Sequence, residues 1–174
     1  MSTLKVSTIS PLGTDATKTI TIGSASNGDV AAGIFTNTPA FQAQISVTQA
    51  VPTGVYTKIQ FNNEIFDTDS AYDNSTNYRF TAPSAGKYLF NANALHAAGT
   101  TTRFTLKFYK NGTNLNASVS QLVNGANSTD WSQNISSIID LSVDDYVEVY
   151  VNHDRGSDSN FELGQFEGYK LIGA

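Results

Sequence analysis

The sequence predicts an all-β protein folded as a two-sheet antiparallel sandwich of the jelly-roll type. Apolar and polar residues alternate with a period of two in most segments between residues 41 and 172. Turn-forming residues separate these segments at intervals of roughly 8–14 residues, and no segment places its apolar residues at helical spacing. Because an alternating strand has one apolar face to bury, such strands are expected to pack as two layers.

The clearest pattern lies in residues 78–90, YRFTAPSAGKYLF, where two alternating runs flank a Pro-Ser-Ala-Gly turn. We predict a β-hairpin here, and because an isolated hairpin is marginally stable, the rest of the sheet must pack against it. Residues 64–77 are polar and are predicted as a surface loop. The other predicted strands, about nine in all with the hairpin, cover residues 41–47, 57–61, 103–110, 115–123, 131–141, 146–151 and 161–172.

Two local signals refine this prediction. Asn111 and Gly112 separate two of the predicted strands and form the dipeptide that most favours a tight hairpin turn. Gly164 and Gly168 lie inside the last predicted strand, which indicates a bulge or a close approach of another backbone.

The composition of the 174-residue chain excludes several classes of protein. It has no cysteine, which excludes disulfides, zinc-thiolate sites and thiol nucleophiles. With a net charge of −5 and no stripe of Lys and Arg, it is not expected to bind nucleic acid. No apolar run is long enough to cross a membrane.

Residues 1–36 differ from the rest. Two short β-prone pieces, LKVSTI and TITIG, precede a stretch rich in Ser, Asn, Ala and Gly, and neither piece carries enough apolar surface to fold alone. A flexible tail is the alternative, but we expect an attachment and trimerisation arm that becomes ordered on other proteins or on sister chains. The first ten residues lack the basic and apolar regions of a signal peptide, so synthesis in the cytoplasm is expected.

Several motifs occur in one order and together resemble a known family. They are NYRFTAPSAGKYLFNA, FTLKFYKNGT, LSVDDYVEVYV and FEGYKLIG, and they resemble the globular head of complement C1q in the C1q/tumour-necrosis-factor superfamily. Asp144 departs from the pattern, because the family usually has Gly there. The resemblance covers residues 37–174 and implies a ten-strand jelly roll that assembles as a homotrimer. The matching residues are Phe80, Ala82, Pro83, Gly86, Tyr88, Phe90, Lys110, Asn111, Gly112, Asp145, Val147, Phe166, Gly168, Tyr169 and Leu171.

Residues 1–36 are similar to the N-terminal segments of tail-fibre-like proteins of bacteriophages. We therefore expect a trimeric virion structural protein (a fibre, tip or capsid-surface protein) that is attached to other virion proteins through residues 1–36. Its C1q-like head would adhere to a glycan or protein of the host surface. The alternative is a non-viral, soluble C1q-like binding module or lectin. An enzyme is not expected, since no nucleophile-elbow, zinc-protease, phosphate-loop or dinucleotide motif is present.

An aromatic-rich sandwich without cysteines is expected to hide apolar surface between subunits. The residues expected in the trimer interface are Tyr88, Phe90, His96, Phe108, Tyr169 and Leu171.

The alternating direction of successive strands, here called strand parity, predicts where a ligand would bind. If consecutive strands are antiparallel, the connections at residues 97–102, 124–130 and 152–160 all lie at the end opposite the arm. The side chains of His153, Asp154 and Asp158 also include the ligand types of a calcium site, although a solvated loop remains the alternative, and no other cofactor is expected. The candidate binding residues are Asn127, Asp130, Trp131, His153, Asp154, Arg155 and Asp158.

Overall fold

The computed structural model describes residues 38–96, 103–123 and 130–171, and for residues 117–123 and 131 it describes the backbone only. These residues lie in one compact unit, Asn37–Ala174. The arm predicted for residues 1–36 lies outside the described residues.

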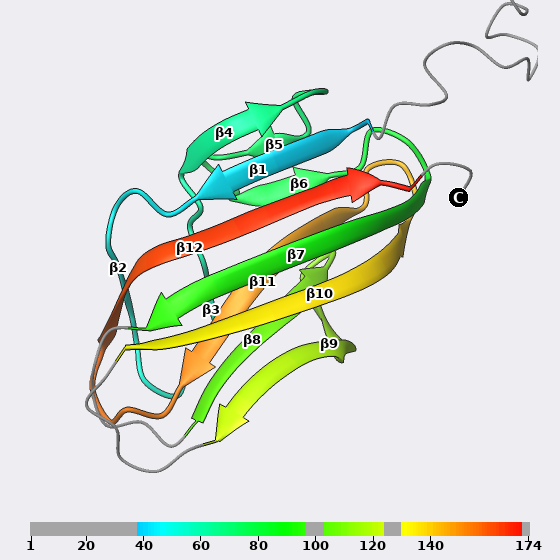
Figure 1. Cartoon of the computed structure of the whole chain (residues 1–174). Helices are drawn as coiled ribbons and strands as arrows, with labels where there is room; N and C mark the ends of the chain where they lie inside the picture. The colour runs from blue at the N-terminus through cyan, green and yellow to red at the C-terminus, as the bar shows by residue number, and fades with distance from the viewer. Residues whose placement is uncertain (1–37, 97–102, 124–129, 172–174) are drawn as a thin grey trace, which may run out of the picture. The chain divides into compact units, whose positions relative to one another are not determined.

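Within the described ranges all regular structure is β, in two antiparallel sheets stacked face to face (Figure 1). Sheet A has the strand order β10-β7-β12-β1-β4, and sheet B has the order β5-β6-β11-β8-β9. The short β2 pairs with β12, and the short β3 pairs with β11. This is the predicted jelly roll. The strands are β1 (Ala40–Gln44), β2 (Gln49–Val51), β3 (Thr57–Lys58), β4 (Asn63–Asp67), β5 (Tyr72–Asp73), β6 (Arg79–Thr81), β7 (Gly86–His96), β8 (Arg103–Lys110), β9 (Thr113–Val123), β10 (Trp131–Leu141), β11 (Tyr146–His153) and β12 (Ser159–Lys170).

The predicted hairpin at residues 78–90 is wrong in one respect. Its two runs form β6 and β7, but β6 pairs with β5 and β11 in sheet B, whereas β7 pairs with β10 and β12 in sheet A. The Pro-Ser-Ala-Gly segment is therefore a corner between the sheets. The alternation was predicted correctly because both strands bury one face in the same core, where the ring centroids of Phe80 and Phe90 are 5.4 Å apart.

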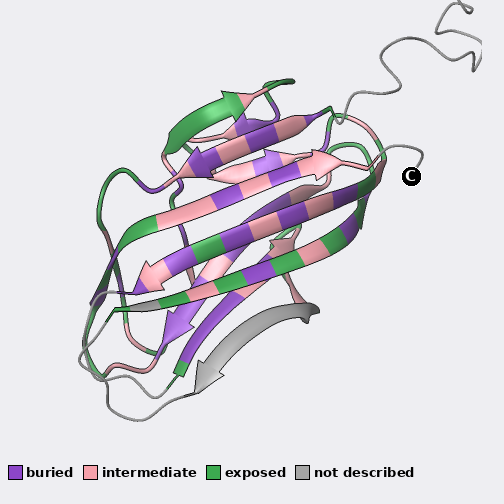
Figure 2. Cartoon of the chain, viewed as in Figure 1, coloured by how far each residue is buried: buried purple, intermediate pink, exposed green. Residues whose placement is uncertain are grey.

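Residues 64–77 are not a continuous loop, because they contain most of β4 and all of β5. All but the last residue of β4 are exposed, and these include Ile65 and Phe66, as its colour in Figure 2 shows. A strand at the edge of a sheet with no buried face has no period of two, so the sequence pattern could not reveal it.

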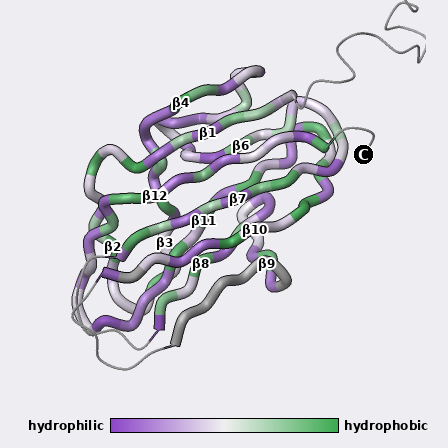
Figure 3. The backbone as a smooth tube through the Cα atoms, in the orientation of Figure 1, coloured by the Kyte–Doolittle hydropathy of each residue, from purple (hydrophilic) through white to green (hydrophobic). Residues whose placement is uncertain are grey.

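The core between the sheets is built from aromatic rings. Phe41 lies at its centre and stacks on Tyr72 and Phe80, with ring centroids 4.9 and 5.0 Å away. Figure 2 shows buried positions alternating mainly with intermediate ones along β7, and exposed positions alternating with buried or intermediate ones along β10. Figure 3 shows the matching alternation of hydropathy. At Gly168 a Cβ atom would lie 2.9 Å from Leu89 O and 2.5 Å from the Phe90 ring, and the first distance confirms the close backbone approach predicted there.

The strand ends gather at two ends of the sandwich, as parity predicts. At the base end, towards which β12 points in Figure 1, the Lys170 N–H donates to Pro39 O and the Asp144 N–H to Ala82 O. Asn111 and Gly112 form their turn at this end with φ of 51° and 72°, and Asp144 takes a φ of 67° without being glycine. The opposite end, here called the far end, carries the last residues of β7, β9 and β11 and the first residues of β8, β10 and β12.

Candidate functional site

The far end contains two connections that are described completely, residues 52–56 between β2 and β3 and residues 154–158 between β11 and β12. The second contains three of the predicted binding residues. The Gly54 N–H donates to His153 O over 2.7 Å, and the Gly156 N–H donates to Thr53 Oγ1 over 3.0 Å. The Arg103 N–H donates to Asp154 Oδ1 over 2.8 Å. Because these bonds tie the loop to the β2–β3 connection and to the start of β8, its backbone is held in place before any ligand binds.

His153 does not belong to this surface, and its prediction as a binding residue is wrong. Its side chain is fully buried at the end of β11, where Nε2–H donates to Val51 O over 2.9 Å. Nδ1 accepts the Arg155 N–H, and the ring meets that of His96 edge-on at 5.0 Å. Burial is the main cause that lowers the pKa of His153, and the bond to Val51 opposes it.

Because the His153 side chain points into the core, it cannot take part in the calcium site that the sequence suggested as a possibility. Both of its ring nitrogens are already engaged, so it does not turn towards Asp154 and Asp158. Across the described ranges no three His, Cys, Asp or Glu side chains are placed to hold a metal ion.

The remaining binding candidates are distributed around the far end. Asp158 is exposed in the loop, and the half-buried Arg155 donates from its guanidinium to Ser159 Oγ over 3.2 Å. Asp154 is half-buried against Arg103. Asp130 is exposed just before β10, and Trp131 is the first residue of β10, although only its backbone is described. Asn127 lies outside the described residues, as do the connections at 97–102 and 124–129.

The sequence reasoning missed Arg103 at this end. Its guanidinium donates to Asn152 Oδ1 over 3.4 Å, and its backbone N–H holds Asp154. The signal was available, since Arg103 is the first residue of a correctly predicted strand and must lie beside the far-end loops.

Four of the predicted trimer-interface residues are corrected. Tyr88, Phe90, His96 and Phe108 are all at most 1% exposed in the single chain, so they have no surface left for a partner to cover. They form the inner face of the sandwich, whereas a subunit interface must use the outer face. Two other predicted interface residues, Tyr169 and Leu171, retain partial exposure.

The outer face of sheet A carries a different apolar set near the base end, here called the apolar row. Ile138 on β10 pairs with Leu89 on β7, Leu89 pairs with Tyr169 on β12, and Tyr169 pairs with Ala40 on β1. Paired residues of antiparallel strands project on the same side of the sheet, so the four side chains form one line. Ile138 is 58% exposed, and the other three are partly exposed.

On β10, β7, β12 and β1 the next line of outward residues towards the far end is polar, and on β4 it ends at the exposed Phe66, which pairs with Gln42. Ser136 pairs with Asn91, Asn91 with Glu167 and Glu167 with Gln42, whose amide donates to Glu167 Oε2 over 2.8 Å. The apolar row is therefore bounded on this side by hydrogen-bonded amides and a carboxylate.

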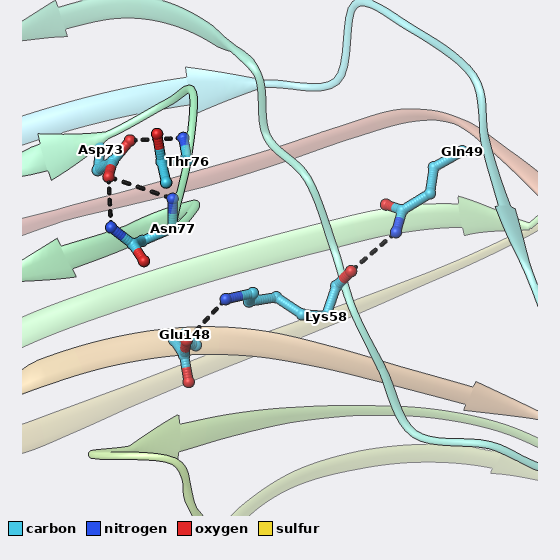
Figure 4. Close-up of polar contacts among 6 residues, drawn as sticks. All are labelled: Gln49, Lys58, Asp73, Thr76, Asn77 and Glu148. Carbon is cyan, nitrogen blue, oxygen red and sulfur yellow. Dashed lines mark hydrogen bonds and ion pairs between the residues drawn. The ribbon is translucent and has the colours of Figure 1, made fainter.

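Two polar clusters near sheet B are shown in Figure 4. The Asp73 carboxylate accepts the backbone N–H groups of Ser75, Thr76 and Asn77 and the Asn77 amide, which holds the pKa of Asp73 well below its usual range. Since all of these donors lie within four residues, Asp73 fixes the β5–β6 connection. In the second cluster Lys58 reaches across β11, and its Nζ lies 3.0 Å from Glu148 Oε1.

Comparison with known proteins identifies the family. The model of the C1q domain matches residues 40–171. The chain belongs to the C1q family. Domains of this fold are generally non-enzymatic binding or structural modules. They commonly form homotrimers. No match was found among curated protein sequences.

Several solved structures have the same fold as this C1q domain. The globular domain of zebrafish complement 1qA is 18% identical, with a TM-score of 0.60, covering 76% of this chain and 97% of that one. The PRD1 vertex protein P5 is 12% identical, with a TM-score of 0.56 and coverages of 76% and 96%. Eiger TNF from S. frugiperda is 10% identical, with a TM-score of 0.52 and coverages of 78% and 95%. At these identities the likeness establishes the fold alone. In the described part of this C1q domain there is no helix with the length and apolarity needed to cross a bilayer.

Proposed function

We propose that this protein is a homotrimeric structural protein of a bacteriophage virion, with its C1q domains displayed for attachment to the host surface. Residues 1–36 join it to other virion proteins, and the far-end loops face outward. Asp130 and Asp158, both exposed, and Arg155, whose backbone is held in the loop, are the residues that would contact a host glycan or protein.

The apolar row is the observation that carries the trimer. It crosses four strands of sheet A at the end where the described chain begins at residue 38, so three chains packed through it would bring their copies of residue 38 close together. Covering Ile138, Leu89 and Tyr169 removes apolar surface from water, which is the main driving force of association. An obligate interface of this kind buries more than about 2,000 Å² in total.

The virion assignment rests on two supports. The fold is shared with the PRD1 vertex protein P5, a phage protein whose name places it in a particle. Residues 1–36 have the composition of a segment that becomes ordered only when it binds a partner. A component of a virus particle needs such an attachment segment, whereas a self-contained binding domain does not.

A soluble, non-viral C1q-like binding module is the second candidate. It is favoured by the similarity to the zebrafish complement domain, whose TM-score exceeds that of the vertex protein. Such a module would use the same trimer and the same far-end loops, so the two functions differ only in the partner of residues 1–36.

Mass spectrometry of purified particles separates the two functions. The proposal expects the protein in virions, and it expects that deleting residues 2–36 leaves a folded trimer that no longer joins the particle. Absence of the full-length protein from virions would favour the soluble module. Normal incorporation of the deleted protein would show that residues 1–36 are not the attachment arm.

A further inference from the structure

The two sheets carry opposite charge. The strands of sheet B contain five basic and two acidic residues, whereas the strands of sheet A contain two basic and five acidic residues. Although the chain has a net charge of −5, the strands of sheet B therefore carry more cations than carboxylates. One of these cations, Lys110, pairs with the buried Val147, and its Nζ donates to Asp140 O of sheet A, so it does not belong to the outer face. The basic residues of sheet B are Lys58, Arg79, Arg103, Lys107 and Lys110, and its acidic residues are Asp73 and Glu148.

Tyrosine rings lie between these cations on the outer face of sheet B. Tyr109 and Tyr150, on neighbouring strands, stack with ring centroids 4.0 Å apart. Lys107 Nζ lies 4.7 Å from the centre of the Tyr56 ring, and the Arg79 guanidinium lies 4.0 Å from that of Tyr146. We call these six residues the tyrosine face.

Neither cation of the tyrosine face forms an ion pair with a carboxylate within the described ranges. Asp73 lies opposite Arg79 in the pairing of β5 with β6, and its carboxylate accepts the backbone N–H groups of residues 75–77. Across the described ranges the two ion pairs are Lys58–Glu148 and Lys110–Asp145, and neither includes Lys107 or Arg79. The one carboxylate at the centre of this face, Glu148, is 5% exposed and already paired with Lys58 (Figure 4). Lys107 and Arg79 are instead held over aromatic rings, which fixes their positions. Because Lys107 faces Tyr150 and not a carboxylate on β11, its positive charge is available to a ligand.

The side chains that β8 and β11 direct to this face include no aliphatic residue. Their outward positions carry tyrosine, a cation, one carboxylate and small polar residues, as the pairs Tyr150–Lys107, Glu148–Tyr109 and Asn152–Thr105 show. Glu148, Asn152 and Thr105 are themselves buried. Burial raises the pKa values of Tyr109 and Tyr150, so both hydroxyls stay protonated and able to donate hydrogen bonds at neutral pH.

We propose that the tyrosine face binds an acidic polysaccharide. Each sugar ring has an apolar C–H face that packs on a tyrosine ring, and hydroxyls that pair with the tyrosine O–H. Its carboxylate or sulfate groups would form charge-assisted hydrogen bonds with Lys107 and Arg79, and the basic field of sheet B would steer the polymer to this side of the molecule.

This inference goes beyond the proposed function and does not depend on it. The tyrosine face lies on sheet B, whereas the apolar row lies on sheet A and the loops at the far end. Polysaccharide binding can therefore fail while the virion assignment stands, and the reverse also holds.

The test measures binding of the full-length protein to heparin and to alginate, with neutral dextran and double-stranded DNA as comparison polymers. We expect binding to heparin or alginate and none to dextran. Lys107→Gln should raise the Kd roughly tenfold or more, which is the usual effect of losing one charge-assisted hydrogen bond. It should also lower the slope of log Kd against log salt by about one. The matched control is Lys87→Gln, which removes the same charge from sheet A and should change the Kd less than about twofold.

A second pair of variants tests the rings without changing charge. Tyr56 and Phe66 are exposed by 39% and 46%, the first on the tyrosine face and the second on β4 of sheet A. Tyr56→Ala should weaken binding several-fold by removing the ring beneath Lys107, and Phe66→Ala should not. Circular dichroism confirms that each variant is folded.

Three results would overturn the proposal. The first is that neither heparin nor alginate binds. The second is that Lys87→Gln weakens binding as much as Lys107→Gln does. The third is that DNA binds as tightly as the polysaccharides do. The last two would show a general attraction between a polyanion and any exposed cation.

Discussion

Acid should destabilise the far end through His153. This ring is fully buried, Nε2–H donates to Val51 O, and Nδ1 accepts the Arg155 N–H. A second proton can bind only at Nδ1, where it would break the bond from Arg155 and place a charge 5.0 Å from the buried ring of His96. Phe104 and Phe161, from β8 and β12, close the site without offering a counter-charge.

The sign and size of the effect follow from the lowered pKa. Burial lowers the pKa of His153 in the folded state, Arg155 adds to the shift, and the carboxylates of Asp154 and Asp158 oppose it. Between this pKa and the unfolded value of about 6.5 the unfolded chain binds more protons. Stability is therefore fully present above pH 6.5 and is lost as pH falls towards the folded pKa, by up to about 1.4 kcal/mol per pH unit for one histidine.

Urea unfolding between pH 5 and 8, at one protein concentration, measures how the free energy of unfolding changes with pH. The matched variant is His153→Gln, because its amide can still donate to Val51 O. Other titrating groups are common to both proteins, so the difference between the two curves isolates His153. We expect the variant to lose less stability on acidification. Parallel curves would refute the reasoning.

Two further changes test the packing of the core. Phe41→Ala should lower the free energy of unfolding by about 3–5 kcal/mol, since this ring is 1% exposed and touches rings of both sheets. The control, Phe66→Ala on β4, should lower it by less than about 0.5 kcal/mol. Similar losses for both variants would contradict the assignment of the core. Gly168→Ala would bring its Cβ within 2.5 Å of the Phe90 ring and should lower the free energy of unfolding by about 1–3 kcal/mol. An unchanged midpoint of urea unfolding would show that β7 and β12 approach less closely than described.

The strands that bury one face were predictable from alternation alone. The bounds of β8 and β10 agree with the prediction, and counting successive strands placed the ends of β7 to β12 at the correct ends of the sandwich. The short or edge strands β2, β4 and β5 were missed, and β3 was predicted at residues 57–61 although it ends at Lys58. A strand of two or three residues, or one exposed on both faces, leaves too little alternation to detect.

The candidate site was harder to predict, because alternation tells which residues share a face but not which face points inward. Tyr88 and Phe90 were assigned to a subunit interface although they line the core, whereas Leu89 between them projects outward. His153 was placed in a loop because the strand was ended at Val151. Extending the alternation by two residues puts it inside. Ile138 and Leu89 come together only through pairing of β7 with β10, which is a property of the topology.

The most direct test of the central claim is the mass of the protein in solution with and without the apolar row. Ile138 and Leu163 are exposed by 58% and 62% on the outer face of sheet A, the first near the base end and the second near the far end. By sedimentation equilibrium at micromolar concentration we expect three chains of 18.7 kDa for the unmodified protein and for Leu163→Asp, and a folded monomer for Ile138→Asp. A monomeric unmodified protein, or a trimer that survives Ile138→Asp, would contradict assembly through the apolar row.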